Sequence, residues 1–240
     1  MHRLRLKTLL ASCVLVLTGA CASLDRAGSK QAEVLPVENV THSAAVTDPN
    51  YLMGRSFQSR RQYEAAIGAY RKSLEANPRN AEAHNAIGNC HVRLKQLTLA
   101  EQAFKTAIEL TPSVYPALNL SDVYINQGRL EEADTVLTRA LHRNPTEGDA
   151  YYGLALLRVE QHRLEDAEQL AHQAHDHLHH IEDVHLLLAQ IHQYQGRLDR
   201  IPEDLQLYVT EAKPSPTREH IKNVLADAYE KRERKSNVSR

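Results

Sequence analysis

The chain has 240 residues, of which 42% are hydrophobic, and its 29 Lys and Arg against 30 Asp and Glu give a formal net charge of −1. Proteins that bind nucleic acid through its phosphates need a strongly basic face, so this balance argues against that class. With no Trp and only two Phe, the composition favours one extended helical domain over a sheet protein.

The N-terminal segment has a basic start, an apolar run from Thr8 to Ala20 and small residues before Cys21. A run of 13 residues is shorter than the roughly 20 that a membrane-spanning helix needs, so the segment predicts a secretory signal over residues 1–20. Its end, Leu17-Thr18-Gly19-Ala20-Cys21, resembles the bacterial lipobox. On that resemblance the chain is cut before Cys21, which then carries lipid, including palmitate, as the first residue of a lipoprotein.

An ordinary secretory cleavage after Ala20 or Ala22 is the alternative, because both sites have the small residues that signal peptidase requires. The product would be a soluble periplasmic protein. Because Ala22, and not aspartate, follows Cys21, the lipobox resemblance implies the outer membrane, with the protein facing the periplasm. Residues 21–47 are polar, contain Pro36 and lack a helical or strand period, which predicts a flexible tether.

From residue 48 one pattern returns every 33 or 34 residues. Its small first site is Gly54, Gly88, Ser121 and Ala155, its second is Ala66, Ala100, Ala133 and Ala167, and a large residue follows at Tyr70, Phe104 and Leu137. Pro78, Pro112 and Pro145 close three units. This order resembles the tetratricopeptide repeat (TPR), in which small residues let two helices cross closely and a proline ends the second helix.

The resemblance implies an all-α fold, a right-handed superhelical solenoid over residues 48–212 with four clear units and one degraded unit. The fourth unit has Arg158 where an aromatic residue is expected, and the fifth has Ile201 and Pro202 at its second small site. The sequence Gln-Gly-Arg-Leu occurs twice, at 127–130 and at 195–198. Residues 213–240 predict a capping helix over 216–230, with Ile221, Val224, Leu225 and Tyr229 on one face, and a basic disordered tail from Lys231.

In TPR proteins the first helices of the units line a concave groove that takes a peptide. Carried over by position, the partner-binding candidates are Arg55, Asn85, Asn89, Arg93, Asp122, Asn126, Tyr152, Gln190 and Tyr194. Tyr51 stands where the carboxylate clamp of chaperone-binding TPR proteins has a lysine, which argues against recognition of a free C-terminus. The alternative for any one of these residues is an ordinary solvated side chain.

Histidines crowd the stretch from 172 to 192. His172, His175 and His179 have helical spacing, so they are candidates for a divalent-metal or pH-responsive site, against the alternative of a solvated helix end. Cys90 is expected to be a buried structural thiol. The sequence contains no nucleophile elbow, phosphate loop or zinc-protease motif, so we expect neither an enzyme nor a cofactor.

Lipoproteins of this size and plan resemble the pilotins and assembly factors of type IV and Flp pili. The leading hypothesis is therefore a non-catalytic scaffold that binds a protein subunit of a pilus or secretion complex in the envelope, through its concave face. An adaptor for polysaccharide export or for peptidoglycan enzymes is an alternative. A periplasmic metal-binding or pH-sensing protein that uses the histidines of 172–192 is a rival from another class.

Overall fold

The computed structural model describes residues 48–177 and 182–238. The predicted signal, the predicted lipidation site Cys21, the predicted tether and His179 lie outside the described residues. Within those residues every regular element is an α-helix, which confirms the all-α class. None of the helices in this part of the chain combines the length and the hydrophobicity that crossing a membrane requires.

The helices follow one another as hairpins, with a last helix on its own. They are α2 (Pro49–Ser59) and α3 (Tyr63–Ala76), α4 (Ala81–Arg93) and α5 (Leu97–Leu110), α6 (Tyr115–Asn126) and α7 (Leu130–Arg143), α8 (Gly148–Glu160) and α9 (Leu164–His177), α10 (Glu182–Tyr194) and α11 (Ile201–Glu211), and α12 (Pro216–Val238). The first and second helices of each hairpin coincide with the two halves of each sequence unit.

Each hairpin turns through one residue with positive φ, and these residues are Arg61, Lys95, Gly128, His162 and Gly196. In each turn the next residue donates its N–H to a carbonyl five positions earlier, as in Arg129 N to Tyr124 O and Arg197 N to His192 O, both 2.9 Å. The two Gln-Gly-Arg-Leu segments are therefore turns in which glycine takes the left-handed conformation without a Cβ clash.

The described residues divide into two compact units within α8, one ending at Leu157 and the other beginning at Arg158. The division lies inside the predicted solenoid over 48–212, whose bounds stay a prediction. It falls where the fourth repeat first departs from the pattern, at Arg158 itself.

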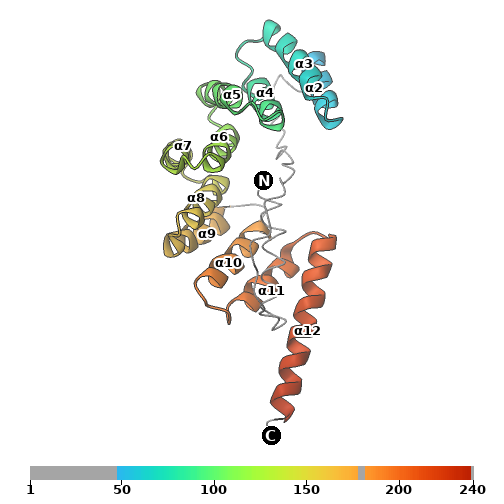
Figure 1. The fold of residues 1–240 in the computed structure, drawn as a ribbon, viewed down its shortest axis with the longest axis vertical. Coiled ribbons are helices and arrows are strands. Elements are labelled where there is room, and N and C mark those ends of the chain that lie inside the picture. The colour runs from blue at the N-terminus through green and yellow to red at the C-terminus, as the bar shows by residue number, and fades with distance from the viewer. Residues whose placement is uncertain (1–47, 178–181, 239–240) are drawn as a thin grey trace. The chain divides into compact units, whose positions relative to one another are not determined.

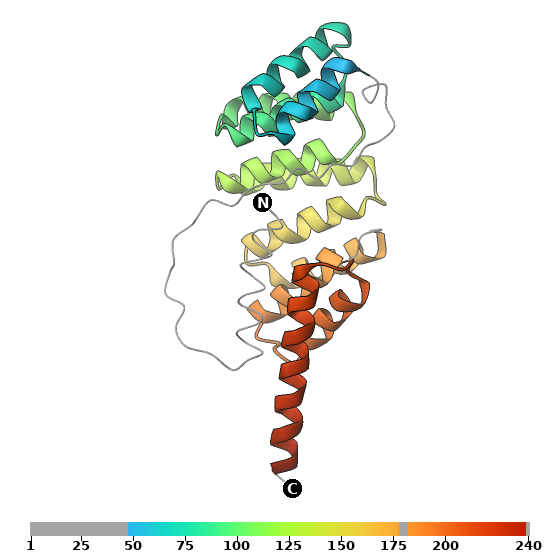
Figure 2. The same ribbon diagram turned by 90° about the vertical axis from the view of Figure 1, so that its right-hand side faces the viewer.

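In the N-terminal unit successive hairpins stack, with α3 on α4 and α5 on α6 (Figure 1). After a quarter turn the helices of this unit are seen to lie side by side (Figure 2). Tyr70 and Phe104, the large residues of the pattern, are fully buried, and Gly54 and Gly88 face their rings. Small and large residues of the repeat therefore form one packed layer within each of the first two hairpins.

Two neighbouring residues of α4, Cys90 and His91, are buried. His91, at a position expected to be large and apolar, is buried, and its Nδ1 lies 2.7 Å from Gln96 Oε1 in the following turn. Cys90 is fully buried, as predicted, and burial raises the pKa of its thiol to about 12. A thiol held protonated in this way has little nucleophilic character, which fits a packing role.

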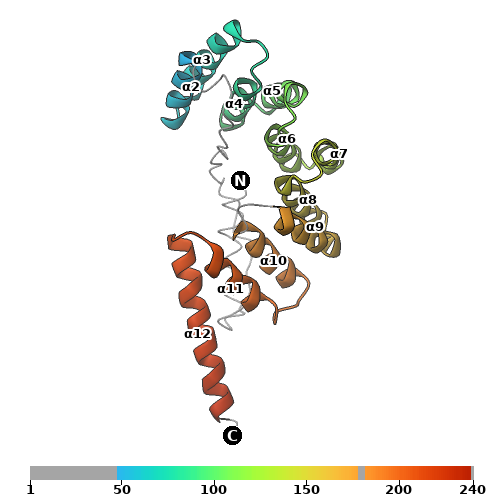
Figure 3. The same ribbon diagram turned by 180° about the vertical axis from the view of Figure 1, so that it is seen from behind.

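The C-terminal unit has a second core, formed by α10, α11 and the start of α12 (Figure 3). Ile221 and Leu225 of the predicted capping face are buried. Tyr229, one turn further along the same face, is 43% exposed, so the buried part of that face ends before it. The predicted disordered tail is wrong, because α12 continues to Val238. Residues 231–235 are Lys, Arg and Glu, which favour a helix, and the helix runs on past α11.

Candidate functional site

An amide pair joins two neighbouring first helices in the N-terminal unit. Asn119 Nδ2 on α6 donates a hydrogen bond to Asn85 Oδ1 on α4, at 2.9 Å, and both side chains are half-buried. Asn85 is one of the predicted candidates, whereas Asn119 was missed. The repeat spacing makes Leu118 the counterpart of Asn85, and Asn119 follows Leu118 directly. This position next to the equivalent site is the signal that could have found Asn119.

Asn89 lies one helical turn beyond Asn85, so both amides are on the same face of α4. Its side chain is half-buried and has no hydrogen-bond partner among the described residues. A primary amide carries two donors and an acceptor, the groups that pair with a peptide backbone. We call Asn85, Asn89 and Asn119 the first-helix face.

Other predicted residues of this unit bond within the protein. Arg93 Nε donates to the hydroxyl of Tyr63 on α3 at 3.2 Å, and its guanidinium carbon lies 5.6 Å from the centre of that ring. Asn126 is exposed, and its amide donates to the backbone carbonyl of Asp122 in its own helix. Arg93 is thus tied to the preceding helix, and Asn126 to its own helix. Arg55, Asp122 and Tyr152 are half-buried.

The two predicted residues of the C-terminal unit differ from each other. Tyr194 is 54% exposed, whereas Gln190 is only 5% exposed. Gln190 therefore does not line an open surface, which corrects its assignment to a groove. All of Val184 to His192 is buried in α10, which packs against both α9 and α11, so this first helix has no open face at Gln190.

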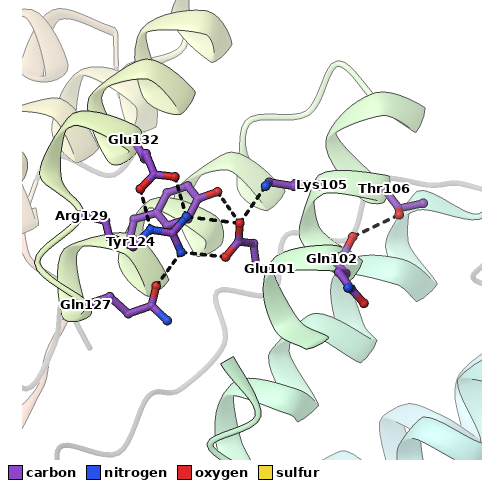
Figure 4. Close-up of polar contacts among 8 residues, drawn as sticks. All are labelled: Glu101, Gln102, Lys105, Thr106, Tyr124, Gln127, Arg129 and Glu132. Carbon is purple, nitrogen blue, oxygen red and sulfur yellow. Dashed lines mark hydrogen bonds and ion pairs between the residues drawn. The ribbon is translucent and has the colours of Figure 1, made fainter. Parts of the chain in front are cut away.

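A charged cluster holds the second helix of one repeat to the hairpin of the next (Figure 4). Glu101 on α5 accepts hydrogen bonds from Tyr124 Oη at 2.9 Å and from Arg129 Nη1 at 2.8 Å, and it pairs with Lys105 Nζ at 2.7 Å. The Arg129 guanidinium also lies over the Tyr124 ring, 4.2 Å from its centre, and pairs with Glu132. These donors, of which Arg129 has the largest effect, lower the pKa of the Glu101 carboxyl to about 2.

A matching cluster occurs two repeats later, in the C-terminal unit. Arg197, from the second Gln-Gly-Arg-Leu turn, pairs with Glu168 at 2.9 Å, as Arg129 pairs with Glu101. His192 takes the place of Tyr124, with Nε2 3.2 Å from Glu168 Oε1. Its Nδ1 lies 2.7 Å from Asp204 Oδ2, and burial raises the pKa of Asp204.

These clusters explain why the turn sequence recurs. The arginine of each Gln-Gly-Arg-Leu segment bonds a glutamate that follows the second small-site alanine of the preceding repeat. By tying α6 to α5, the Glu101 cluster also fixes the helix that carries Asn119. The position of the first-helix face therefore depends on the contacts of the Glu101 cluster, which join a second helix to the turn of the next hairpin.

The histidines are placed in different settings. His172 is exposed and His175 half-buried, both on α9, while His185 and His192 on α10 are buried. Of the predicted metal candidates, His175 is brought together with His185 and Glu211 and not with His172. The contact between His175 and α10 depends on tertiary packing, which helical spacing within one segment does not predict.

The stacked hairpins, with glycines packed against buried rings, define a tetratricopeptide-repeat protein, a class of protein-interaction scaffolds. A family model described as the C-terminal domain of cilia and flagella-associated protein 70 matches residues 7–239. The chain therefore belongs to this TPR family.

Among curated relatives, human Protein O-mannosyl-transferase TMTC2 is 26% identical over 122 residues, which is 48% of this chain and 15% of that protein. The chain thus spans a small part of that relative's length. Among solved structures, PilF of Pseudomonas aeruginosa has a TM-score of 0.61 at 19% identity, covering 76% of this chain and 83% of that one. PilW, a widely conserved type IV pilus biogenesis factor, has a TM-score of 0.59 at 20% identity, covering 74% and 86%. Likeness at these identities concerns the fold.

Proposed function

We propose that this protein is a non-catalytic scaffold that holds a segment of a pilus or secretion-complex subunit on its first-helix face. We further propose that Cys21 carries lipid and anchors the protein in the outer membrane, facing the periplasm. The scaffold would thus keep an envelope subunit close to the membrane in which it assembles.

The observation that carries the proposal is the half-buried amide of Asn89, which has no internal hydrogen-bond partner, beside the bonded pair Asn85 and Asn119. A fixed row of amides on neighbouring first helices matches the alternating N–H and C=O groups of an extended peptide. The site needs no catalytic group, because binding alone is its chemistry.

Two further observations favour the bacterial envelope. The lipobox-like segment ending at Cys21 gives the membrane anchor. The fold is similar to PilF and to PilW, and the latter is described as a type IV pilus biogenesis factor. Since that likeness is one of fold, the identity of the partner is the part of the proposal that experiment must supply.

The test is photocrosslinking from defined positions in intact cells. A photoreactive residue replaces Asn89 in one variant and Gln102 in a matched control, because Gln102 is an exposed amide on α5, the second helix of the same repeat. We expect one pilus or secretion-complex subunit to crosslink from position 89 and not from position 102. Mass spectrometry of the crosslinked product names the subunit.

Affinity gives the quantitative check. Once the subunit is known, Asn85→Ala and Asn89→Ala should each weaken its binding roughly fivefold, since a hydrogen bond contributes about 1 kcal/mol, whereas Gln102→Ala should leave it unchanged. The first-helix face is not the functional surface if positions 89 and 102 crosslink the same protein equally well. The same conclusion follows if the protein crosslinked from position 89 belongs to neither a pilus nor a secretion complex.

A further inference from the structure

A cluster of metal-type ligands lies where the ends of three helices of the C-terminal unit meet. His175 comes from the last turn of α9, His185 from the first turn of α10, and Glu211 is the last residue of α11. One ligand atom from each lies within 4.8 Å of the other two. The three residues are far apart in sequence, so the fold alone assembles them.

His185 is the buried member of the cluster. It is 2% exposed, its Nε2 lies 2.9 Å from Glu211 Oε2, and its ring stands edge-on to His175 at a centroid distance of 5.3 Å. Its other ring nitrogen, Nδ1, is buried without a hydrogen-bond partner. Buried polar atoms are nearly always satisfied, so the folded chain by itself leaves Nδ1 unused, while Nε2 is the nitrogen that faces Glu211.

The spacing is close to that of a metal site. Zinc ligands about 2.0–2.1 Å from the ion, arranged as a tetrahedron, lie roughly 3.4 Å from one another. His185 Nε2 and Glu211 Oε2 are now 2.9 Å apart as a hydrogen-bonded pair, so they would separate by about half an ångström to share an ion. The side chains of His175 and Glu211 are 38% and 35% exposed, so both have room to rotate through the remaining ångström or so while His185 stays fixed.

The charge around the cluster suits a cation. Glu211 supplies one carboxylate, Asp176 lies 3.7 Å from His175 Nδ1, and Asp204 interacts electrostatically with His185. Two imidazoles and a carboxylate are ligands typical of zinc and related ions, and zinc tolerates the irregular geometry of such a site because it has no d-electron preference.

We propose that His175, His185 and Glu211 bind a divalent transition-metal ion, with Zn²⁺ as the best match, leaving one coordination position for water. The ion joins the end of α9 to α10 and α11, so it pins together the helices of the C-terminal unit. This role is independent of the peptide-binding function proposed for the N-terminal unit. It differs from a site on one helix face, since exposed His172 takes no part.

The test uses the full-length protein in detergent, freed of metal by a chelator, and titrated with Zn²⁺ by calorimetry. The informative variants are His175→Ala and Glu211→Gln, because both side chains are partly exposed and their loss leaves the buried core intact. The matched control is the double variant His172→Ala and His177→Ala, which removes two exposed histidines from the same helix. Co²⁺ absorption in the visible range reports the coordination geometry separately.

We expect one Zn²⁺ per chain, with affinity lowered at least about tenfold in either informative variant and unchanged in the control. Zn²⁺ should also raise the thermal unfolding temperature of the native protein and of the control, but not that of His175→Ala. The proposal is overturned if no stoichiometric binding occurs, if the informative variants bind as tightly as the native protein, or if the control loses the site.

Discussion

A Cβ atom added at Gly88 would lie 2.5 Å from Cε1 of Phe104. This is far shorter than a van der Waals contact, and Phe104 is fully buried, so its ring has no space into which to move. Gly54 and Tyr70 stand in the same relation one repeat earlier, also at 2.5 Å. The small and large sites of the repeat are thus the two sides of one contact, between the first and second helices of a hairpin.

Gly88→Ala should therefore destabilise the protein by about 1–3 kcal/mol, because the added methyl group overpacks the buried ring of Phe104. The lower end of this range allows for the gain in helix propensity that alanine brings. Urea unfolding followed by circular dichroism measures the change.

Gly68→Ala is the control for that substitution. Gly68 lies in α3, and a Cβ there would meet nothing within 4 Å. The same chemical change should stabilise the protein by roughly 0.5–1 kcal/mol, since glycine within a helix is less favourable than alanine. If both substitutions shift stability in the same direction, the contact between Gly88 and Phe104 does not limit packing.

The hairpin turns give a second pair of opposed substitutions. Lys95 has a φ of 59°, where a side chain costs about 1–2 kcal/mol, so Lys95→Gly should stabilise the protein by up to about 1 kcal/mol. Gly128, the equivalent residue of the next repeat, has a φ of +73° and open space around it, so Gly128→Ala should destabilise through conformation alone, by about 1 kcal/mol. Unfolding midpoints at constant m-value would check both.

The Glu101 cluster predicts a pH-dependent stability. The pKa of Glu101 is lowered from 4.5 to about 2, so its stabilising effect is complete above pH 4.5 and is lost as the pH falls towards 2. Glu101→Gln should cost roughly 1.5–3 kcal/mol at pH 7, the range of hydrogen bonds to charged groups. The difference in unfolding free energy between this variant and the native protein should shrink as the pH falls below 4.5.

Glu109→Gln is the control, because Glu109 is exposed on the same helix, α5. Its stability should match that of the native protein throughout the titration. A constant deficit for Glu101→Gln at every pH would mean that packing at this position, and not the charge of the carboxylate, holds α5 to the next hairpin.

The proposed anchor predicts that Cys21→Ser abolishes incorporation of labelled palmitate and releases the protein from the outer-membrane fraction. Cys13→Ser, which removes a thiol within the predicted signal, should leave both unchanged. Palmitate labelling that persists in Cys21→Ser, or that is absent from the native protein, would support ordinary secretory cleavage instead.

Much of the fold could be predicted because the repeat encodes contacts between residues of fixed spacing. Gly54 and Tyr70, or Gly88 and Phe104, meet wherever two helices of this length are joined by a short turn, so their pattern predicts the hairpin. The candidate site was predicted less well. Asn85 and Asn89 share a face as expected, but Gln190 is buried, since a residue's position on a helix does not specify what packs over it.

The sequence by itself determined the helical hairpins, their period of 33 or 34 residues and the regular spacing of their turns, because each depends on local backbone preference and on small side chains at fixed intervals. Tertiary structure decided which polar residues meet. It joined Asn119 to Asn85, placed His192 between Glu168 and Asp204, and gathered His175, His185 and Glu211 from three helices. Such contacts depend on how neighbouring helices are rotated and offset, which the summed packing of many side chains sets and no single stretch of sequence encodes.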